Sequence, residues 1–157
     1  MKNFIIFLFF TTSLFVNAQD SFEPIEEKVS WEQSYESAKS ISKAENKPIL
    51  IFFTGSDWCG PCKKLVSDFF ESDKFRGIAE NEFVLYEADF PRNKSLVTKS
   101  QKKDNARLGS KYGVSSYPTL VVVNEKEKEL GKIKGYNLMR ETNYHFDFLD
   151  DVLNKIK

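Results

Sequence analysis

Two cysteines separated by two residues, Cys59 and Cys62, are the side chains of this chain best suited to chemistry. Such a pair can close a small disulfide ring, and the thiolate form of a cysteine is a nucleophile. The pair lies between an apolar run, 49–53, and a helical pattern, so it falls at a helix N-terminus, where free N–H groups and the helix dipole favour a thiolate. We therefore predict that Cys59 is exposed at the helix tip and attacks, whereas Cys62 faces inward and resolves.

A static structural disulfide and half of a metal site are the alternatives for this pair. The chain has one histidine, His145, and no third cysteine, so Cys and His alone cannot supply four zinc ligands in a monomer. A four-residue ring also constrains the unfolded chain little. Redox chemistry is therefore favoured, with no metal and no cofactor beyond the Cys59–Cys62 disulfide itself. We interpret His145, far from the pair in sequence, as a packed or surface residue.

Bulk composition excludes several classes of protein. The 157 residues include 23 basic and 23 acidic side chains, and this zero formal charge argues against nucleic-acid binding through phosphate contacts. With 41% hydrophobic residues and many aromatic ones, the chain does not have the composition of a disordered protein. We expect one folded domain and no nucleic acid among its partners.

The first eighteen residues have the pattern of a signal peptide. Lys2 precedes an unbroken apolar run, 4–10, and residues 16–18, Val-Asn-Ala, resemble a small-residue cleavage site. We predict a signal peptide at 1–18 and a periplasmic or secreted domain at 19–157, with 22 basic and 23 acidic residues. An uncleaved segment that anchors the protein in a membrane is the alternative, although the apolar stretch falls short of the roughly 20 residues that a spanning helix needs.

Hydrophobic periodicity predicts alternating helices and strands in the mature domain. Helices are expected from a capping box at Ser30 through Ile41, from Cys62 through Phe70, near 75–80, around 106–112 and over 146–156, with Phe146, Leu149, Val152, Leu153 and Ile156 on one face. Strands are expected at 49–53, 83–88, 119–123 and 129–134, the last two as a hairpin. The polar segment 91–105 is interpreted as a loop. This order predicts an α/β fold with a mixed sheet.

The sequence around the cysteine pair resembles the thioredoxin superfamily. The resemblance is carried by residues 58–62, Trp-Cys-Gly-Pro-Cys, and by the downstream stretch 111–119, which contains Tyr117 and Pro118 and leads into an apolar strand. Residues 53–59, Phe-Thr-Gly-Ser-Asp-Trp-Cys, are similar to a secreted thioredoxin-like subgroup. The resemblance implies a three-layer α/β/α fold around a central mixed sheet.

The resemblance also implies roles for the residues around the pair. It implies a cis peptide bond between Tyr117 and Pro118, although X-Pro bonds in general are trans in about 95% of cases. The proline would then lie beside the disulfide, and the Tyr117 backbone would be free to pair with an extended substrate segment. The residues expected to contact the substrate are Trp58, Gly60, Pro61, Tyr117 and Pro118.

The chain departs from the family at a buried acid. Typical members have an aspartate six residues before the first cysteine, where it helps to remove a proton from the second thiol, and Phe53 occupies this position here. The lysine that faces the aspartate corresponds to Leu85 in our register, so both members of a buried ion pair would be replaced by apolar side chains. The proton of Cys62 would then pass to Glu87, to Asp57 or to water. Glu87 is favoured among these acceptors, and the alternative for this residue is an ordinary exposed carboxylate at a strand end.

The predicted function is an exported protein-disulfide reductase that acts on protein disulfides. The Gly-Pro dipeptide between the cysteines resembles that of thioredoxin, whose reduction potential is about −270 mV, and this similarity favours reduction. A membrane-bound electron donor would re-reduce the protein, which we expect to be a monomer. The alternatives are a disulfide oxidase or isomerase for exported proteins, and a non-catalytic thioredoxin-like binding module that assists cytochrome maturation.

Overall fold

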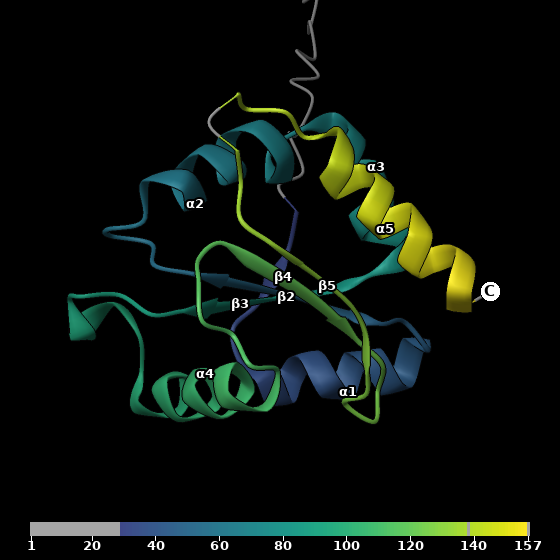
Figure 1. Ribbon diagram of the computed structural model, residues 1–157. Coiled ribbons are helices and arrows are strands. Elements are labelled where there is room, and N and C mark those ends of the chain that lie inside the picture. The colour runs from purple at the N-terminus through teal and green to yellow at the C-terminus, as the bar shows by residue number, and fades with distance from the viewer. Residues whose placement is uncertain (1–28, 138, 157) are drawn as a thin grey trace, which may run out of the picture.

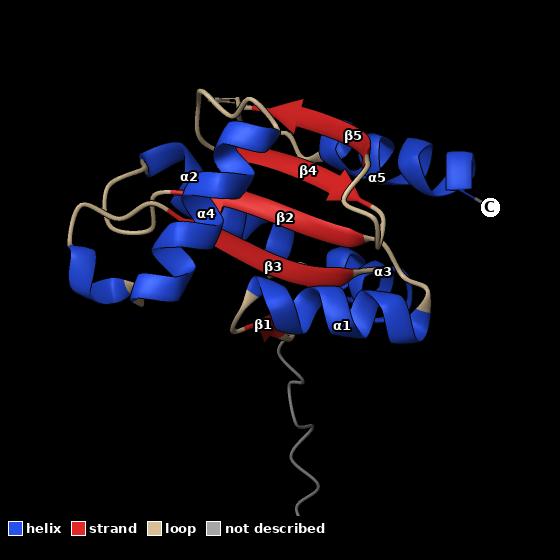
Figure 2. Ribbon diagram, turned by 90° about the horizontal axis from the view of Figure 1, so that it is seen from below, coloured by secondary structure: helices blue, strands red, loops and turns tan. Residues whose placement is uncertain are grey.

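A five-stranded mixed sheet forms the centre of the computed structural model, which describes residues 29–137 and 139–156. The strand order is β1-β3-β2-β4-β5 (Figure 2), with β1, β3 and β2 parallel, β4 antiparallel to β2, and β5 antiparallel to β4. The strands are β1 Trp31–Glu32, β2 Ile49–Thr54, β3 Val84–Asp89, β4 Thr119–Val123 and β5 Glu129–Lys134. The four predicted strands are confirmed to within a residue at each end. The predicted signal peptide, 1–18, lies outside the described residues.

Helices cover both faces of this sheet. Those of the described residues are α1 Tyr35–Glu45, α2 Gly60–Leu65, α3 Asp73–Glu82, α4 Lys99–Lys111 and α5 Asn143–Ile156. Helices α1 and α4 lie on one face, and α2, α3 and α5 lie on the other (Figure 1). This arrangement confirms the predicted three-layer α/β/α fold. Within 29–137 and 139–156, no helix is long and apolar enough to cross a membrane.

Strand β2 is the central strand, and its alternating side chains divide the core in two. All six of its residues are buried. Leu50 and Phe52 belong to the core under α2, α3 and α5, whereas Ile51 and Phe53 belong to the core under α1 and α4. The strand is therefore held on both faces up to Thr54, and the turn that follows it starts from a fixed point.

The first elements differ from the prediction. Residues 31–32 form β1 beside β3 and are not the first turn of a helix. Helix α1 begins after Ser34, whose hydroxyl accepts a hydrogen bond from the Ser37 N–H over 3.1 Å. The ring of Trp31 instead packs against Phe52 and Phe70, with ring centres 6.1 and 5.1 Å away. This aromatic packing accounts for an apolar residue that helical spacing had assigned to α1.

Helix α4 begins at Lys99, well before the predicted start at residue 106. Thr98 and Gln101 form a capping box, in which each side chain accepts a hydrogen bond from the backbone N–H of the other. The helix buries only a narrow stripe that includes Asn105 and Leu108, so its first turns carry no apolar periodicity. The segment 91–105 is therefore a loop with a 3₁₀ turn at Lys94–Leu96, followed by two turns of α4.

The helix after the cysteines widens into a π-helical turn at Val66–Phe70. Consecutive side chains of an α-helix diverge by about 100°. Phe69 and Phe70 are consecutive, yet both are buried, and their ring centres are 5.0 Å apart. The π-helical turn corrects the prediction of one regular helix through Phe70.

Helix α5 closes the molecule, as the sequence predicts. Four members of its predicted apolar face are buried: Phe146, Leu149, Val152 and Leu153. The fifth, Ile156, lies in the last turn and is 40% exposed, so the burial of this face ends before it. The helix is thus anchored through its first three turns.

Candidate active site

Cys59 and Cys62 form a disulfide at the N-terminus of α2, with their Cα atoms 5.2 Å apart. Cys59 is the N-cap residue, and its Sγ accepts a hydrogen bond from the Cys62 N–H over 3.2 Å. Gly60 and Pro61 are exposed in the first turn. Only 3% of Cys59 is exposed, so the prediction of an exposed Cys59 is wrong for this oxidised form. A capping side chain folds back over the helix end, and here it joins the apolar core.

The loop before β4 lies against this core. The peptide bond between Tyr117 and Pro118 is cis, as the resemblance implied. Pro118 is buried, and its carbonyl accepts a hydrogen bond from the Gly135 N–H over 2.8 Å, which ties the loop to the end of β5. Tyr117 packs against the cluster that contains both cysteines. The two sequence motifs that carry the resemblance therefore meet in space.

Trp58 is wedged over the turn between β2 and α2. A Cβ atom on Gly55 would lie 2.3 Å from Cε2 of the indole, so only glycine fits at that position. The indole N–H donates to the Phe90 carbonyl over 2.9 Å, and the ring meets the Tyr117 ring edge-on with centres 5.7 Å apart. Trp58 is 37% exposed and forms a fixed wall beside the disulfide.

Hydrogen bonds join this turn to the loop that follows β3. Ser56 donates to the Asp89 carboxylate through its N–H, over 2.8 Å, and through its hydroxyl, over 2.6 Å. Asp57 accepts hydrogen bonds from the Arg92 N–H, over 2.9 Å, and from the Asn93 N–H, over 2.8 Å. The two loops follow neighbouring parallel strands and lie side by side at one end of the sheet (Figure 1). Each loop therefore fixes the position of the other.

These bonds give Asp57 a task other than proton transfer. Both of its oxygens accept backbone N–H groups, and the hydrogen bond from Asn93 is the largest cause that lowers the pKa of Asp57 below its ordinary value. A carboxylate stabilised in its charged form is a poor proton acceptor. Asp57 therefore serves to hold the loop after β3 in place.

The β2 residue on the dithiol face is Phe52, which corrects the predicted register. Phe53 lies on the opposite face, in the core under α1 and α4. The partner of Phe52 in β3 is Glu87, and Leu85 lies two residues earlier in that strand. A count of six residues back from Cys59 reaches the wrong face, because the turn holds one residue more than this count allows. The sequence analysis had predicted that two apolar residues, Phe53 and Leu85, replace the buried ion pair of the family. In the structure the paired residues on the dithiol face are Phe52 and Glu87.

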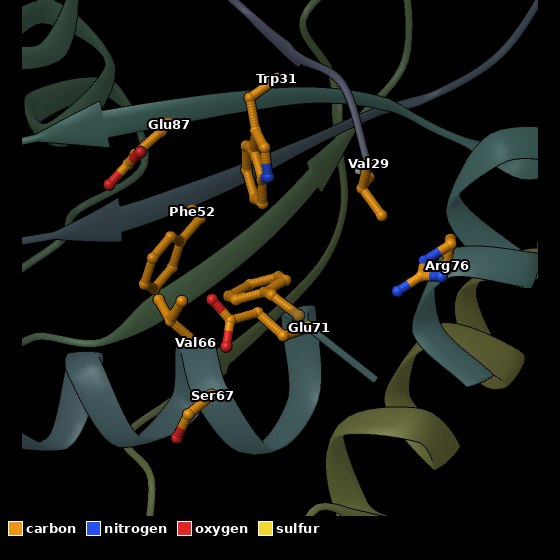
Figure 3. Close-up of a pocket in the computed structure, with 9 residues that line it drawn as sticks. Val29, Trp31, Phe52, Val66, Ser67, Glu71, Arg76 and Glu87 are labelled. Carbon is orange, nitrogen blue, oxygen red and sulfur yellow. The ribbon is translucent and has the colours of Figure 1, made fainter. Parts of the chain in front are cut away.

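A pocket of about 720 Å³ opens beside Phe52 and Glu87 (Figure 3). Its lining residues are Val29, Trp31, Phe52, Val66, Ser67, Phe70, Glu71, Arg76 and Glu87. Val66 follows Cys62 by one helical turn, so the pocket reaches the rear of the dithiol helix. Burial in the pocket raises the pKa of Glu87 above its ordinary value, and the Asp89 carboxylate acts in the same direction. The Glu87 residue is nonetheless exposed to solvent, so this effect of the pocket on its pKa is limited.

His145 is a packed residue, one of the two interpretations of the sequence. It is fully buried at the start of α5, and its ring lies 4.2 to 5.7 Å from the rings of Phe69, Tyr136 and Tyr144. Neither ring nitrogen makes a hydrogen bond of normal geometry. Burial lowers the pKa of His145 to about 4, although the nearby Gly135 backbone acts in the opposite direction. The ring is therefore neutral at pH 7.

Sequence reasoning missed Asp89, Phe90 and Arg92 as partners of the active-site turn. Asp89 ends β3, Phe90 follows it, and Arg92 lies in the polar segment that the sequence analysis interpreted as a loop. None of the three belongs to a motif. A usable signal was the position of this segment directly after β3. The carboxyl ends of neighbouring parallel strands meet at one edge of a sheet, so a loop there reaches the turn that follows β2.

The fold and the site together define a thioredoxin-like domain with a disulfide at a helix N-terminus beside a cis-proline loop. Residues 35–147 match the family model described as a thioredoxin-like domain, and the chain belongs to this family. A domain of this family with a closed Cys-x-x-Cys disulfide is equipped for thiol–disulfide redox chemistry.

Particular relatives narrow the comparison. Disulfide bond reductase DsbH of Chlamydia pneumoniae is 37% identical over 103 residues, which cover 66% of this chain and 61% of the relative. Thioredoxin-related protein DsbJ of the same organism is 28% identical over 110 residues, which cover 70% of this chain and 31% of the relative. The aligned part of this chain thus spans less than two thirds of the length of these relatives.

Solved structures show the same likeness. A structure described as DsbH oxidoreductase is 30% identical, with a TM-score of 0.71, and the match covers 88% of this chain and 94% of that chain. A thioredoxin from Thermus thermophilus is 17% identical, with a TM-score of 0.59 and coverage of 82% and 88%. At 17% identity, the similarity to the second structure shows a shared fold alone.

Proposed function

We propose that this protein is an exported protein-disulfide reductase that works through Cys59 and Cys62. The observation that carries the proposal is their disulfide at the start of α2, next to the Tyr117–Pro118 loop. The similarity to the chlamydial disulfide bond reductase DsbH supports reduction as the direction. The Gly-Pro dipeptide between the cysteines supports the same direction, since thioredoxin is reducing at about −270 mV.

The proposed reaction starts from the reduced pair. The Cys59 thiolate, stabilised by the Cys62 N–H, attacks one sulfur of a substrate disulfide. The substrate S–S bond breaks, a mixed disulfide forms on Cys59, and the departing sulfur takes a proton. Cys62 then loses its proton and attacks the Cys59 sulfur, which releases the second substrate thiol. Two electrons and two protons reach the substrate, and the enzyme is left as the disulfide with no separate cofactor.

The proton of Cys62 passes to Glu87 in this proposal. The carboxylate lines the pocket behind the dithiol helix, and a pKa raised above its ordinary value makes it a better proton acceptor than an unperturbed glutamate. We expect Glu87→Gln to slow the resolving step several-fold and to shift its pH dependence to higher pH. Glu71→Gln, which lines the same pocket, is the matched control. An unchanged pH profile in Glu87→Gln would leave solvent as the acceptor.

The substrate binds as an extended segment along the Tyr117 backbone. Trp58 directly precedes Cys59, and Tyr117 packs against the core cluster that contains both cysteines. Gly60 and Pro61, between the cysteines, are exposed and leave the approach to the sulfurs open. Only 3% of Cys59 is exposed in the disulfide form, so the substrate sulfur has a narrow approach to it.

Insulin reduction with dithiothreitol as electron donor tests the enzyme. We expect wild-type protein to accelerate it and Cys59→Ser to be inactive; equal activity in the two would favour a non-catalytic binding module. Cys62→Ser should trap mixed disulfides through Cys59, and the trapped proteins would identify substrates. A reduction potential above about −180 mV would instead favour an oxidase or isomerase.

The proposal includes export and re-reduction by a membrane-bound donor, with the protein as a monomer. Cleavage after residue 18 would give a mature N-terminus at Gln19. N-terminal sequencing of protein recovered from its own cell envelope tests this. A chain that retains residues 1–18 and stays with the membrane fraction would favour the anchored alternative.

A further inference from the structure

The loop after β3 brings one guanidinium group to the wall of the active site. Arg92 is exposed, and its guanidinium carbon lies 5.3 Å from the centre of the Trp58 ring. Trp58 directly precedes Cys59 and meets Tyr117, which belongs to the proposed substrate-binding loop. A cation on Trp58 therefore lies beside the path of a substrate segment.

Arg92 is held there from two sides. Its backbone N–H donates to Asp57, so the root of the side chain is tied to the active-site turn. Its guanidinium lies over an indole that Gly55 and the Phe90 carbonyl keep in place. A guanidinium that contacts an aromatic ring keeps its N–H donors free at the edges. The charge is thus presented in a defined place.

Arg92 forms no direct ion pair among the described residues. Within that part of the chain no carboxylate oxygen lies within 4 Å of its guanidinium, unlike the paired cations elsewhere. The Asp57 carboxylate attracts Arg92 at longer range, but both of its oxygens accept backbone N–H groups, and Asp89 accepts hydrogen bonds from Ser56. Lys63, which donates to the Asp57 carbonyl, adds positive charge on the same side.

We propose that Arg92 makes the site selective for disulfides in acidic segments of its protein substrates. This inference rests on the proposed function and names the substrate class of the same site. An Asp or Glu near the substrate disulfide would pair with the guanidinium as the segment lies along Tyr117. One partly exposed ion pair changes binding by up to a factor of about five, and salt screens it.

Three synthetic peptides test the proposal. Each carries one intramolecular disulfide, flanked by two Asp, two Gln or two Lys residues, and kcat/KM is measured with dithiothreitol as electron donor. We expect wild type to favour the Asp peptide over the Gln peptide about three-fold at low salt and hardly at all at 1 M salt. This ratio cancels any general loss of activity in a variant.

Variants assign the preference to Arg92. Arg92→Gln should bring the ratio close to one, Arg92→Glu should favour the Lys peptide, and Arg92→Lys should keep part of the preference. Lys155→Gln, which removes one positive charge from the last turn of α5, is the matched control and should keep the wild-type ratio. A wild-type ratio in Arg92→Gln, or no preference in a wild type that reduces the Gln peptide, would overturn the inference and leave the proposed function intact. Failure to reduce any of the peptides would overturn both.

Discussion

The two ends of the sheet each contain a carboxylate with several partners, but the partners differ in kind. At the dithiol end, Asp57 accepts hydrogen bonds from two backbone N–H groups. At the opposite end, Glu127 in the β4–β5 turn forms ion pairs with Lys39, Arg107 and Lys111. Backbone N–H donors hold a carboxylate and its loop in one geometry. Long cationic side chains are flexible, so they can keep an ion pair with a carboxylate in many different geometries.

The Glu127 cluster joins three separate elements. Lys39 belongs to α1, and Arg107 and Lys111 belong to α4, so the turn is tied to both helices on that face. Burial raises the pKa of Glu127, but the hydrogen bonds from the three cations outweigh it and lower the pKa to about 2. The residue has a positive φ of 60°, an uncommon conformation for a glutamate.

The difference predicts a division of labour between the ends. Backbone hydrogen bonds and close packing around Trp58 position groups for reaction, so changes there should affect activity. Ion pairs around Glu127 attach a hairpin, so changes there should affect stability alone. The changes at Gly55, Glu127 and Asp57 below test this division, and the change at His145 tests a packed core residue outside both ends.

The largest expected effect is on acid stability, and it comes from His145. Its pKa of about 4 in the fold lies below its ordinary value of about 6.5, so the unfolded state binds more protons between these pH values. The free energy of unfolding should therefore fall by about 3 kcal/mol from pH 6.5 to pH 4. Urea unfolding at a series of pH values measures this. His145→Phe should lose most of this dependence, and a variant as acid-sensitive as wild type would show that another group causes it.

Gly55→Ala should affect both activity and stability. The new Cβ would collide with the Trp58 indole, which must move away from Phe90 and Tyr117. We expect a loss of about 1–3 kcal/mol in the free energy of unfolding and about ten-fold in insulin reduction. Gly77→Ala in α3, where a Cβ meets nothing within 4 Å, is the control and should be neutral or stabilising. Full activity in Gly55→Ala would mean that the position of Trp58 is irrelevant to the reaction.

Glu127→Gln should reduce stability and leave activity as it is. Loss of the charge leaves three cations unpaired, and we expect a cost of about 1–2 kcal/mol at pH 7, between the limits for exposed and buried pairs. Since the folded pKa is depressed, wild type should lose this contribution as the pH falls from about 4.5 to about 2, and the variant should not. Urea unfolding and insulin reduction measured together would show whether the hairpin end influences the reaction.

Asp57→Asn should have the smallest effect of the four changes. In contrast to Glu127→Gln, it should reduce activity and leave stability nearly unchanged. The amide oxygen can accept one of the two N–H groups, so the loop after β3 is loosened but not released. We expect insulin reduction to fall two- to three-fold, on the order of one weakened hydrogen bond, with little change in the urea midpoint. If Asp57→Asn destabilised the protein as much as Glu127→Gln, the proposed division between an end that affects activity and an end that affects stability would be wrong.

The sequence predicted the parts of this molecule that depend on local patterns. The cysteine pair, the strand before it and the β4–β5 hairpin are each marked by a motif or by apolar runs. The register of Phe52 and Glu87 was not predictable in this way, because one additional residue in a turn reverses which face a strand residue occupies. The start of α4 was missed because its first turns face solvent, and there only the capping box marks the helix.

The remaining interactions depend on contacts between distant segments. The pairing of Asp57 with 92–93 and of Glu127 with α1 and α4 joins residues 15 or more positions apart. The sequence contains many lysines and glutamates, and nothing in their spacing marks which of them meet. Only the arrangement of the strands brings these particular side chains together.

The placement of Trp58 also gives the protein an optical signal. The chain has two tryptophans, Trp31 in the pocket and Trp58 next to Cys59, and a disulfide is an efficient quencher of nearby indole fluorescence. Reduction of the pair should therefore brighten Trp58 much more than Trp31. In a Trp31→Phe variant, Trp58 would be the one remaining tryptophan. Its fluorescence would then report the redox state of the cysteine pair during the reaction without a label on the protein or its substrate.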